Sequence, residues 1–544
     1  MAIIFSKLAK AWNSSRKLIL LIFSAIILSL FSIYIFSQTR LAGDVASHLL
    51  LAVSPILKIG SPYKNFWEIK PPVWPLTVYL WSSLFGFSIL SIRIINIIIM
   101  SLVALSIWFV FKKAFQTPVF EILFFFTILI VPSPLLNSII LPTEILGLLF
   151  SMLALAVLVS MRKDSFKFFF SGLLFFAASQ TKEPFTLTAI AVLPVLIYSL
   201  LQGGFIKAFK NSMQFLFGML ASFFGIFIYL ANLGSAGAYL EVFKFKQVFF
   251  PFSYDRISEN LLPGFSAAAR TFTEFVQGFP LIIFLAICSF YLVNVYKKTF
   301  TLDLHKTRLI TKPMVILNSD KIIKYSIILY ALGSFLGFGL GGTYGSHYLI
   351  QVVVPFYIIN GFLFSYLFKN VTFLYARSRP YFYFALILFV FSVAILMPKR
   401  QYLSSYFPQI TSFTMTDQIH SYEKIVTQLT TSDQCILSVY GWGVSENYLY
   451  SMRKPCTRYF LANIVLQDWQ KKEYSKEIIE NPPAVIIYQT AGADMDIQRF
   501  ESQIINIGKI VDNCYQKDLK EDVVFVPKIF SREELKSCIA ANSI

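Results

Sequence analysis

The sequence predicts a polytopic α-helical membrane protein with a small C-terminal α/β domain. Apolar residues make up 56% of the 544 residues and the mean hydropathy is +0.65. Only 14% of the residues are charged, against about 25% in an ordinary soluble domain. Residues 1–398 contain 31 Lys and Arg against 12 Asp and Glu, whereas residues 399–544 contain 16 against 17. We therefore expect a transmembrane domain over residues 1–398 and an extracytoplasmic domain over residues 399–544.

The first predicted span is the apolar run Leu18–Ser37, which is long enough to cross about 30 Å of hydrocarbon. It is longer than the apolar core of a cleavable signal, so we expect an uncleaved helix with a cytoplasmic N-terminus. Further apolar runs follow at residues 90–111, 119–131, 138–160, 168–180, 184–202, 212–232, 279–296, 325–342, 348–368 and 381–398. The prediction is therefore about eleven transmembrane helices.

Basic residues occupy alternate connections between these runs. Together with the N-terminus, these connections hold 21 of the 31 cations, in the segments Lys112–Lys113, Arg162–Lys167, Lys207–Lys210, Lys297–Lys324 and Lys369–Arg379. By the positive-inside rule they face the cytoplasm, and the other connections and the tail face outward. This distribution explains the net charge of +18 without a nucleic-acid partner.

Whether Val73–Phe85 crosses the membrane determines on which side every later connection is predicted to lie. A full span here would turn the basic connections outward. The segment is short, contains Pro75 and carries several aromatic residues, which favours an interfacial helix at the headgroup level in the first outer loop. A straight transmembrane helix remains the alternative.

In the tail, Asp417–Leu429 and Glu473–Glu480 have helical patterns, and Cys435–Tyr440 and Ala484–Tyr488 are typical of buried strands. Alternation of this kind predicts an α/β domain. Four of the five cysteines lie in this tail: Cys435, Cys456, Cys514 and Cys538. Two interpretations are possible. The cysteines form two disulfides in an oxidising compartment, with three possible connectivities, or they are four buried free thiols. The absence of a CxxC spacing disfavours zinc.

The ionisable residues of the predicted outer face lie in loops or at helix ends, while the predicted spans carry little charge. They are Asp44, His48, Glu68, Lys70, Glu144, Lys182, Glu183, Arg256, Arg270 and His347. Transporters instead place ionisable residues along a pathway within the membrane. The pattern favours chemistry at one membrane surface.

Asp44 follows the first span and is the candidate general base, because a carboxylate near hydrocarbon has a raised pKa suited to proton abstraction. An N-cap of the next helix is the alternative role. His48, one helical turn later, is a hydrogen-bond partner for Asp44 or part of a His-plus-carboxylate metal site. A divalent metal therefore stays open, and no other cofactor is indicated.

Lys70 precedes Pro71 and Pro72, and a proline restricts the residue before it to extended conformations. A fixed cation at the headgroup boundary suits a lipid phosphate, although a snorkelling Lys that anchors a helix is equally open. Lys182 lies at another predicted helix end, and the same two roles are open for it: binding a lipid phosphate or anchoring the helix. Glu144 opens a span after Thr143, so helix capping competes with a catalytic role there.

These motifs resemble the bacterial GT-C glycosyltransferases, and are similar to the protein mannosyltransferases and to the aminoarabinose transferase that acts on lipid A. The resemblance covers nearly the whole chain and rests on the order and spacing of its motifs. They are Gly43-Asp44, Tyr63 with Lys70-Pro71-Pro72, Thr143-Glu144, the Lys182 motif, His347-Tyr348 leading to Pro355, Tyr440-Gly441-Trp442-Gly443, and Tyr448 to Pro455. Two departures are Val45, where many relatives carry a second acid, and Ile69, where others carry Glu; metal binding and the role of Glu68 therefore stay unassigned.

The resemblance implies transfer of one sugar, with inversion, from a polyprenyl-phosphate carrier to a hydroxyl of a lipid, glycan or protein. It implies a bacterial inner-membrane enzyme of cell-envelope glycan or lipopolysaccharide biosynthesis. Asp44 would be the catalytic carboxylate, and Lys70 and Lys182 would bind the donor phosphate. Further candidate active-site residues are His48, Glu68, Glu144, Glu183, Tyr344 and His347.

Two other functions compete with this interpretation. A lipid or sugar transporter or flippase would move its substrate without covalent chemistry, and would need ionisable residues inside the spans. An O-antigen polymerase or ligase would need large outer loops rich in Arg, and the longest one contains only Arg256 and Arg270. The sequence favours the monosaccharide transferase.

Overall fold

A computed structural model describes residues 44–115, 143–160, 164–249, 319–340, 350–351, 421–439, 444–460, 467–488, 506–528 and 531–543. The predicted first span, the predicted runs at 119–131, 279–296 and 381–398, the run at 348–368 apart from residues 350–351, and the predicted domain boundary at 398/399 lie outside these residues. The chain divides into two compact units. The first comprises residues 1–36, 96–223 and 253–410, and the second comprises residues 37–95, 224–252 and 411–544.

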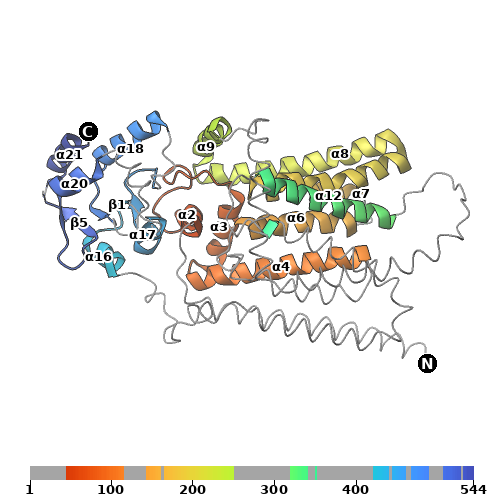
Figure 1. Cartoon of the computed structure of the whole chain (residues 1–544), viewed down its shortest axis with the longest axis horizontal. Helices are drawn as coiled ribbons and strands as arrows, with labels where there is room; N and C mark the ends of the chain where they lie inside the picture. The colour runs from red at the N-terminus through yellow and green to blue at the C-terminus, as the bar shows by residue number, and fades with distance from the viewer. Residues whose placement is uncertain are drawn as a thin grey trace, which may run out of the picture. The chain divides into compact units, whose positions relative to one another are not determined.

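The first unit is helical. Its elements are α6 (Thr143–Ser160), α7 (Asp164–Ser179), the 3₁₀ helix η3 (Glu183–Val192), most of α8 (Leu193–Asn232), α12 (Ser319–Leu340) and the greater part of α4 (Ile89–Phe115). Helices α6, α7, α8 and α12 lie side by side (Figure 1). Within the described residues, three stretches are long and apolar enough to cross a membrane: Leu90–Ile107, Glu183–Asn232 and Lys321–Gly339. This composition is that of a membrane protein, and the count of eleven spans stays a prediction.

Helix α8 folds back on itself. Gly204 has a non-helical backbone with φ 71° and ψ −176°, a conformation that glycine adopts without a steric penalty. The Asn211 amide donates a hydrogen bond of 3.0 Å to the hydroxyl of Ser199, although twelve residues of straight helix would hold them about 18 Å apart. A reversal thus lies between the two predicted runs at 184–202 and 212–232. The start of the first run is 3₁₀ helix rather than the expected α-helix, with Pro184 in its first turn.

Glycines allow backbones of the first unit to approach closely. A methyl group on Gly333 of α12 would overlap the carbonyl of Leu187, and one on Gly337 would overlap the carbonyl of Pro184. The register 333 with 187 and 337 with 184 makes α12 antiparallel to η3. Small residues serve this purpose in membranes, where close packing rather than the hydrophobic effect holds helices together.

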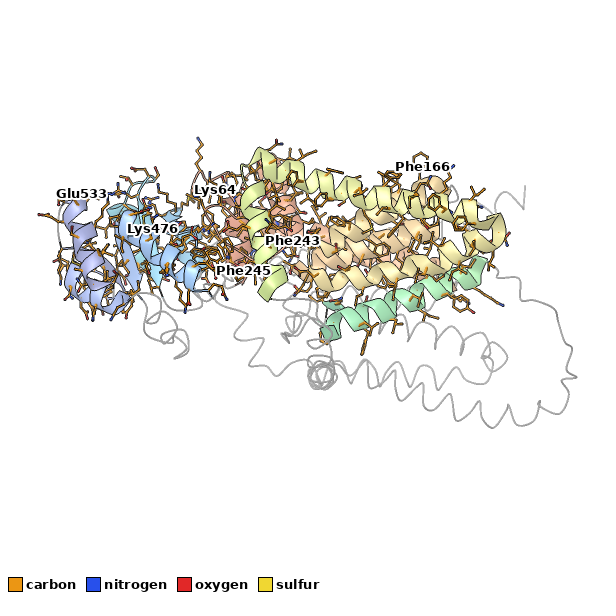
Figure 2. The ribbon with its side chains drawn as sticks, turned by 90° about the horizontal axis from the view of Figure 1, so that it is seen from above. Lys64, Phe166, Phe243, Phe245, Lys476 and Glu533 are labelled. Carbon is orange, nitrogen blue, oxygen red and sulfur yellow. A yellow bond between two sulfur atoms is a disulfide. The ribbon has the colours of Figure 1, made fainter. Side chains whose placement is uncertain are left out.

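The second unit contains α2 (Asp44–Val53), α3 (Val73–Phe85), α9 (Ala236–Phe249) and the tail. Nine consecutive α2 residues, Val45–Val53, are buried, and α2 packs on α3 and on α17 (Val444–Ser451). The helix predicted over Val73–Phe85 is confirmed, while its position at a membrane interface stays a prediction. In Figure 2, α9 carries the labelled Phe243 and Phe245, of which Phe245 is buried.

The tail is the predicted α/β domain. Its five-stranded sheet has the order β2-β1-β3-β5-β4, from β1 (Cys435–Val439), β2 (Lys454–Pro455), β3 (Val485–Tyr488), β4 (Tyr515–Lys517) and β5 (Val524–Pro527). Strand β1 is parallel to β2 and β3, and β5 is antiparallel to β3 and β4. Its helices are α16 (Ser421–Leu429), α17, α18 (Asp468–Glu480), α20 (Ile507–Cys514) and α21 (Arg532–Asn542). The two predicted strands and two predicted helices are therefore present, while residues 417–420 and Tyr440 of the predicted ranges lie outside the described residues.

Two disulfides join the four cysteines of the tail, one between Cys435 and Cys456 and one between Cys514 and Cys538. The first links β1 to the segment after β2, and the second links the end of α20 to α21. The sequence left the connectivity open because all four cysteines lie in separate elements.

The motif from Tyr448 to Pro455 binds elements of the tail to one another. The Tyr448 hydroxyl accepts a hydrogen bond of 2.9 Å from the backbone N–H of Ser438 in β1. The Arg453 guanidinium donates to the carbonyls of Thr427 and Thr430 at 3.1 and 2.7 Å, a favourable place for a cation because helix C-termini are partly negative. Burial lowers the pKa of Arg453. This motif is a structural centre of the tail domain.

Candidate active site

In the first unit, the structure brings together two of the predicted site residues. The Lys182 ammonium and the Glu144 carboxylate form an ion pair and hydrogen bond, and the two residues are only 8% and 2% exposed. Glu144 lies in the first turn of α6, where Thr143 also donates a hydrogen bond of 3.2 Å to the carboxylate. Lys182 lies between α7 and η3 in extended backbone. A buried ion pair of this kind costs solvation free energy and is expected to serve specificity or function.

This ion pair lies at one end of the helical unit, and basic side chains lie at the other end. Gly147 of α6 packs on Phe185 of η3, and Gly337 of α12 packs on Pro184. The start of α6 and the end of α12 therefore lie at the same end of the unit as the ion pair. The opposite end is marked by a cluster that contains Leu158, Phe168, Val195 and Ile322. Three lysines lie close to residues of that cluster in the sequence: Lys167, Lys321 and Lys324. Two more, Lys207 and Lys210, follow the turn at Gly204.

In the second unit, Asp44 is the first residue of α2. His48, one turn later, is buried, and its ring lies 5.4 Å from that of Trp74 on α3. Its environment is the packing surface between α2 and α3. The two roles considered for Asp44 from the sequence, a capping residue and a reactive carboxylate, both stay predictions.

Glu68 and Lys70 lie in the segment 61–72, which we call the Lys70 loop. Glu68 is buried, and its carboxylate accepts a hydrogen bond of 2.9 Å from the backbone N–H of Ile69. The backbone carbonyl of Lys70 accepts a hydrogen bond of 2.9 Å from the hydroxyl of Tyr63, whose backbone has a φ of 61°. A non-glycine residue in this left-handed region is uncommon, so the turn at Tyr63 is held by its surroundings.

Arg458, which no sequence pattern indicated as a site residue, contacts the Lys70 loop within the second unit. Its guanidinium lies 4.7 Å from the ring centre of Trp67 and donates hydrogen bonds to Glu241 of α9 at 3.1 Å and to Glu473 of α18 at 2.6 Å. Burial lowers the pKa of Arg458, but the hydrogen bonds to these two carboxylates outweigh it and raise the pKa above its usual value. Burial raises the pKa of the neighbouring Tyr459, and its hydrogen bond to Glu473 raises it further.

A second missed residue is Arg93, which lies in the second turn of α4. It is buried and interacts electrostatically with Tyr450 of α17. Nothing in the sequence indicated this cation's importance, because one charge in a window of twenty residues changes the mean hydropathy of that window little. Only the packing of α4 shows that the side chain is buried.

The remaining candidates are placed as follows. Glu183 opens η3 and is exposed. Tyr344, His347, Arg256 and Arg270 lie outside the described residues, as does the motif Tyr440 to Gly443. Among the residues that the structure describes, no group of three or more His, Cys, Asp or Glu side chains could hold a metal ion.

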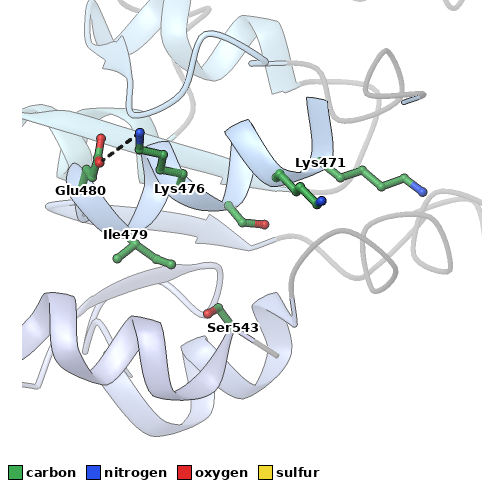
Figure 3. A pocket seen from close by; sticks show the side chains of 7 residues that line it. Lys471, Lys476, Ile479, Glu480 and Ser543 are labelled. Carbon is green, nitrogen blue, oxygen red and sulfur yellow. Dashed lines mark ion pairs between the residues drawn. The ribbon is translucent and has the colours of Figure 1, made fainter. Parts of the chain in front are cut away.

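The tail also has an open cleft of about 480 Å³ between α18 and the end of α21. Figure 3 shows Lys471, Lys476, Ile479, Glu480 and Ser543 around it. Lys476 is paired with Glu480 at 3.7 Å and Lys471 with Asp468 at 3.3 Å. Because Lys476 is exposed and both of these lysines carry acidic partners, this cleft is not assigned as part of the site.

No model of a known protein family matches the chain. No curated protein matches it. A solved structure that does match is the archaeal oligosaccharyltransferase AglB from Archaeoglobus fulgidus in complex with an inhibitory peptide and a dolichol-phosphate, at 12% identity over 91% of this chain and 72% of that chain, with a TM-score of 0.47. At this identity and TM-score, the likeness assigns no activity.

Proposed function

We propose that this protein is an inverting membrane glycosyltransferase that moves a monosaccharide from a polyprenyl-phosphate carrier to a hydroxyl acceptor at the outer face of a bacterial inner membrane. The observation that carries the proposal is the buried Glu144–Lys182 ion pair at the end of the helical unit opposite the basic side chains. If the basic end faces the cytoplasm, as the positive-inside rule predicts, the pair faces outward. That is the side on which the motif resemblance places the reaction.

In this proposal Lys182 and Lys70 bind the phosphate of the donor. An ammonium has three N–H donors, so Lys182 can hold Glu144 and a phosphate oxygen together. As the bond between the anomeric carbon and the phosphate oxygen breaks, its electron pair leaves with the phosphate. The carrier departs as a phosphate monoester, and cations near this oxygen stabilise the charge that develops on it.

Asp44 acts on the acceptor. The acceptor hydroxyl oxygen forms the new bond to the anomeric carbon from the opposite face, and its proton goes to the Asp44 carboxylate. Asp44 is the first residue of α2 that the structure describes.

The distribution of charge in the described spans favours chemistry over transport. Their charged residues lie within about two turns of a helix end, or close to the break at Gly204. A translocation pathway would place such residues at mid-membrane depth. The transporter or flippase alternative is tested by the same experiment.

The experiment is to incubate the purified protein in lipid vesicles with a panel of polyprenyl-phosphate sugars and candidate hydroxyl acceptors, and to measure donor consumption, glycosylated product and movement of the donor across the vesicle membrane. Asp44→Asn is expected to abolish transfer, and Lys182→Met and Lys70→Met to raise the donor KM. Lys64→Met is the matched control for Lys70→Met, because Lys64 is exposed in the Lys70 loop and projects from the surface (Figure 2). Full transfer by Asp44→Asn would remove the assigned base, and movement of intact donor across a vesicle membrane without product would favour the transporter.

A further inference from the structure

The backbone of the Lys70 loop is held from three directions within four residues. The N–H of Trp67 donates a hydrogen bond of 2.7 Å to the carbonyl of Arg458. The carbonyl of Ile69 accepts one of 3.0 Å from the Lys246 ammonium of α9, and the carbonyl of Lys70 accepts one from Tyr63. The tail, α9 and the loop itself therefore each fix one part of this stretch.

Arg458 joins these contacts into one network. Its guanidinium is hydrogen-bonded to α9 through Glu241 and to α18 through Glu473, and lies over the ring of Trp67. Its side chain is only 15% exposed. Arginine is suited to this task because its planar guanidinium can bind two carboxylates and stack on an aromatic ring at once.

Aromatic packing around Trp67 completes the contact. The Trp67 ring is fully buried and lies 5.4 Å from Tyr459 of the tail and 5.9 Å from Phe245 of α9. Tyr63 lies 5.0 Å from Tyr239 of α9. The rings of Trp67, Tyr459 and Phe245 are buried, so we assign them the role of fixing the loop rather than binding a sugar.

We propose that Arg458, with Glu241 and Lys246, is a positioning group that holds the Lys70 loop in the conformation in which Lys70 binds the donor phosphate. The loop-holding part depends only on the contacts above, whereas the effect on Lys70 rests on the proposed function. The tail domain thus contributes to donor binding through the loop rather than by touching the donor.

Hydrogen exchange of the full-length protein in nanodiscs tests the loop-holding part. Arg458→Met and Lys246→Met are expected to speed exchange of the amides in residues 61–72 by about ten-fold or more, the effect of losing a charged hydrogen bond. Exchange in α20 and α21 should stay unchanged, which separates the effect from unfolding of the tail. Lys244→Met is the matched control, because Lys244 is exposed on the same helix. Unchanged exchange in residues 61–72 of both variants would overturn the proposal.

Binding of polyprenyl monophosphate tests the action through Lys70. Arg458→Met is expected to raise the Kd for this lipid, and the donor KM, about ten-fold with little change in kcat. In a Lys70→Met background, the same change should have no further effect, because the group through which Arg458 acts is gone. An equal loss in both backgrounds would overturn the positioning role. If the wild-type protein transfers no sugar while exchange of the loop still rises in Arg458→Met, the proposed function fails and the loop-holding role stands.

Discussion

Lys182 and Glu144, 38 residues apart in the sequence, meet as a buried ion pair at the junction of α6, α7 and η3. Taken separately, Glu144 fits a helix-capping role and Lys182 a helix-anchoring role. Their pairing in an apolar helical unit offsets the cost of burying two charges in a medium that solvates them poorly.

The first prediction concerns this pair. Lys182→Met and Glu144→Gln are each expected to destabilise the protein, by about 3–5 kcal/mol for loss of one partner of a buried ion pair. The double variant should recover part of this stability, because it removes both members of the pair together. Thermal unfolding in detergent, analysed as a double-mutant cycle, measures this coupling. Additive losses would show that the two side chains do not interact.

The second prediction concerns helix packing at Gly333. Gly333→Ala is expected to destabilise the helical unit by about 1–3 kcal/mol, because the new methyl group would overlap the carbonyl of Leu187. The control is Gly225→Ala in α8, where a methyl group meets nothing within 4 Å and helix propensity improves by about 1 kcal/mol. Unfolding temperatures of the two variants should therefore move in opposite directions. A similar loss in both would contradict the close approach of α12 and η3.

The third prediction concerns the two disulfides. They join residues 21 and 24 positions apart, so the chain-entropy model gives each about 3–4 kcal/mol of stabilisation. Replacing either pair by Ser should lower the stability of the tail by similar amounts. Only loss of the Cys435–Cys456 bond should also speed exchange in residues 61–72, because Arg458 follows Cys456 by two residues. Equal exchange in both double variants would contradict this link.

The fourth prediction concerns Arg453. Arg453→Met is expected to destabilise the tail by about 2–4 kcal/mol, since the carbonyls of Thr427 and Thr430 lose charged hydrogen bonds. Arg532→Met is the control, because Arg532 is an exposed residue of α21. Chemical denaturation of the full-length protein, followed by the near-ultraviolet signal of the tail aromatics, measures the difference. No difference between these variants would show that Arg453 does not hold the end of α16.

The sequence by itself determined the class of structure and the position of many elements. Hydropathy located the apolar helices, and short β-branched runs located β1 and β3, because each pattern depends on neighbours along the chain. It also singled out Glu144 and Lys182 as candidate site residues, since charges at the ends of apolar helices are few.

Only the tertiary structure decided which distant residues meet. The partnership of Glu144 with Lys182, the two disulfide connectivities and the contact of Arg458 with Trp67 join residues that no local pattern relates. Arg458 in particular is one of many charges in a polar tail, and only the packing of α9, the tail and the Lys70 loop places its guanidinium over Trp67. Such contacts depend on how buried surfaces fit together, and that fit is set by the packing of the folded chain rather than by the periodicity of any one segment.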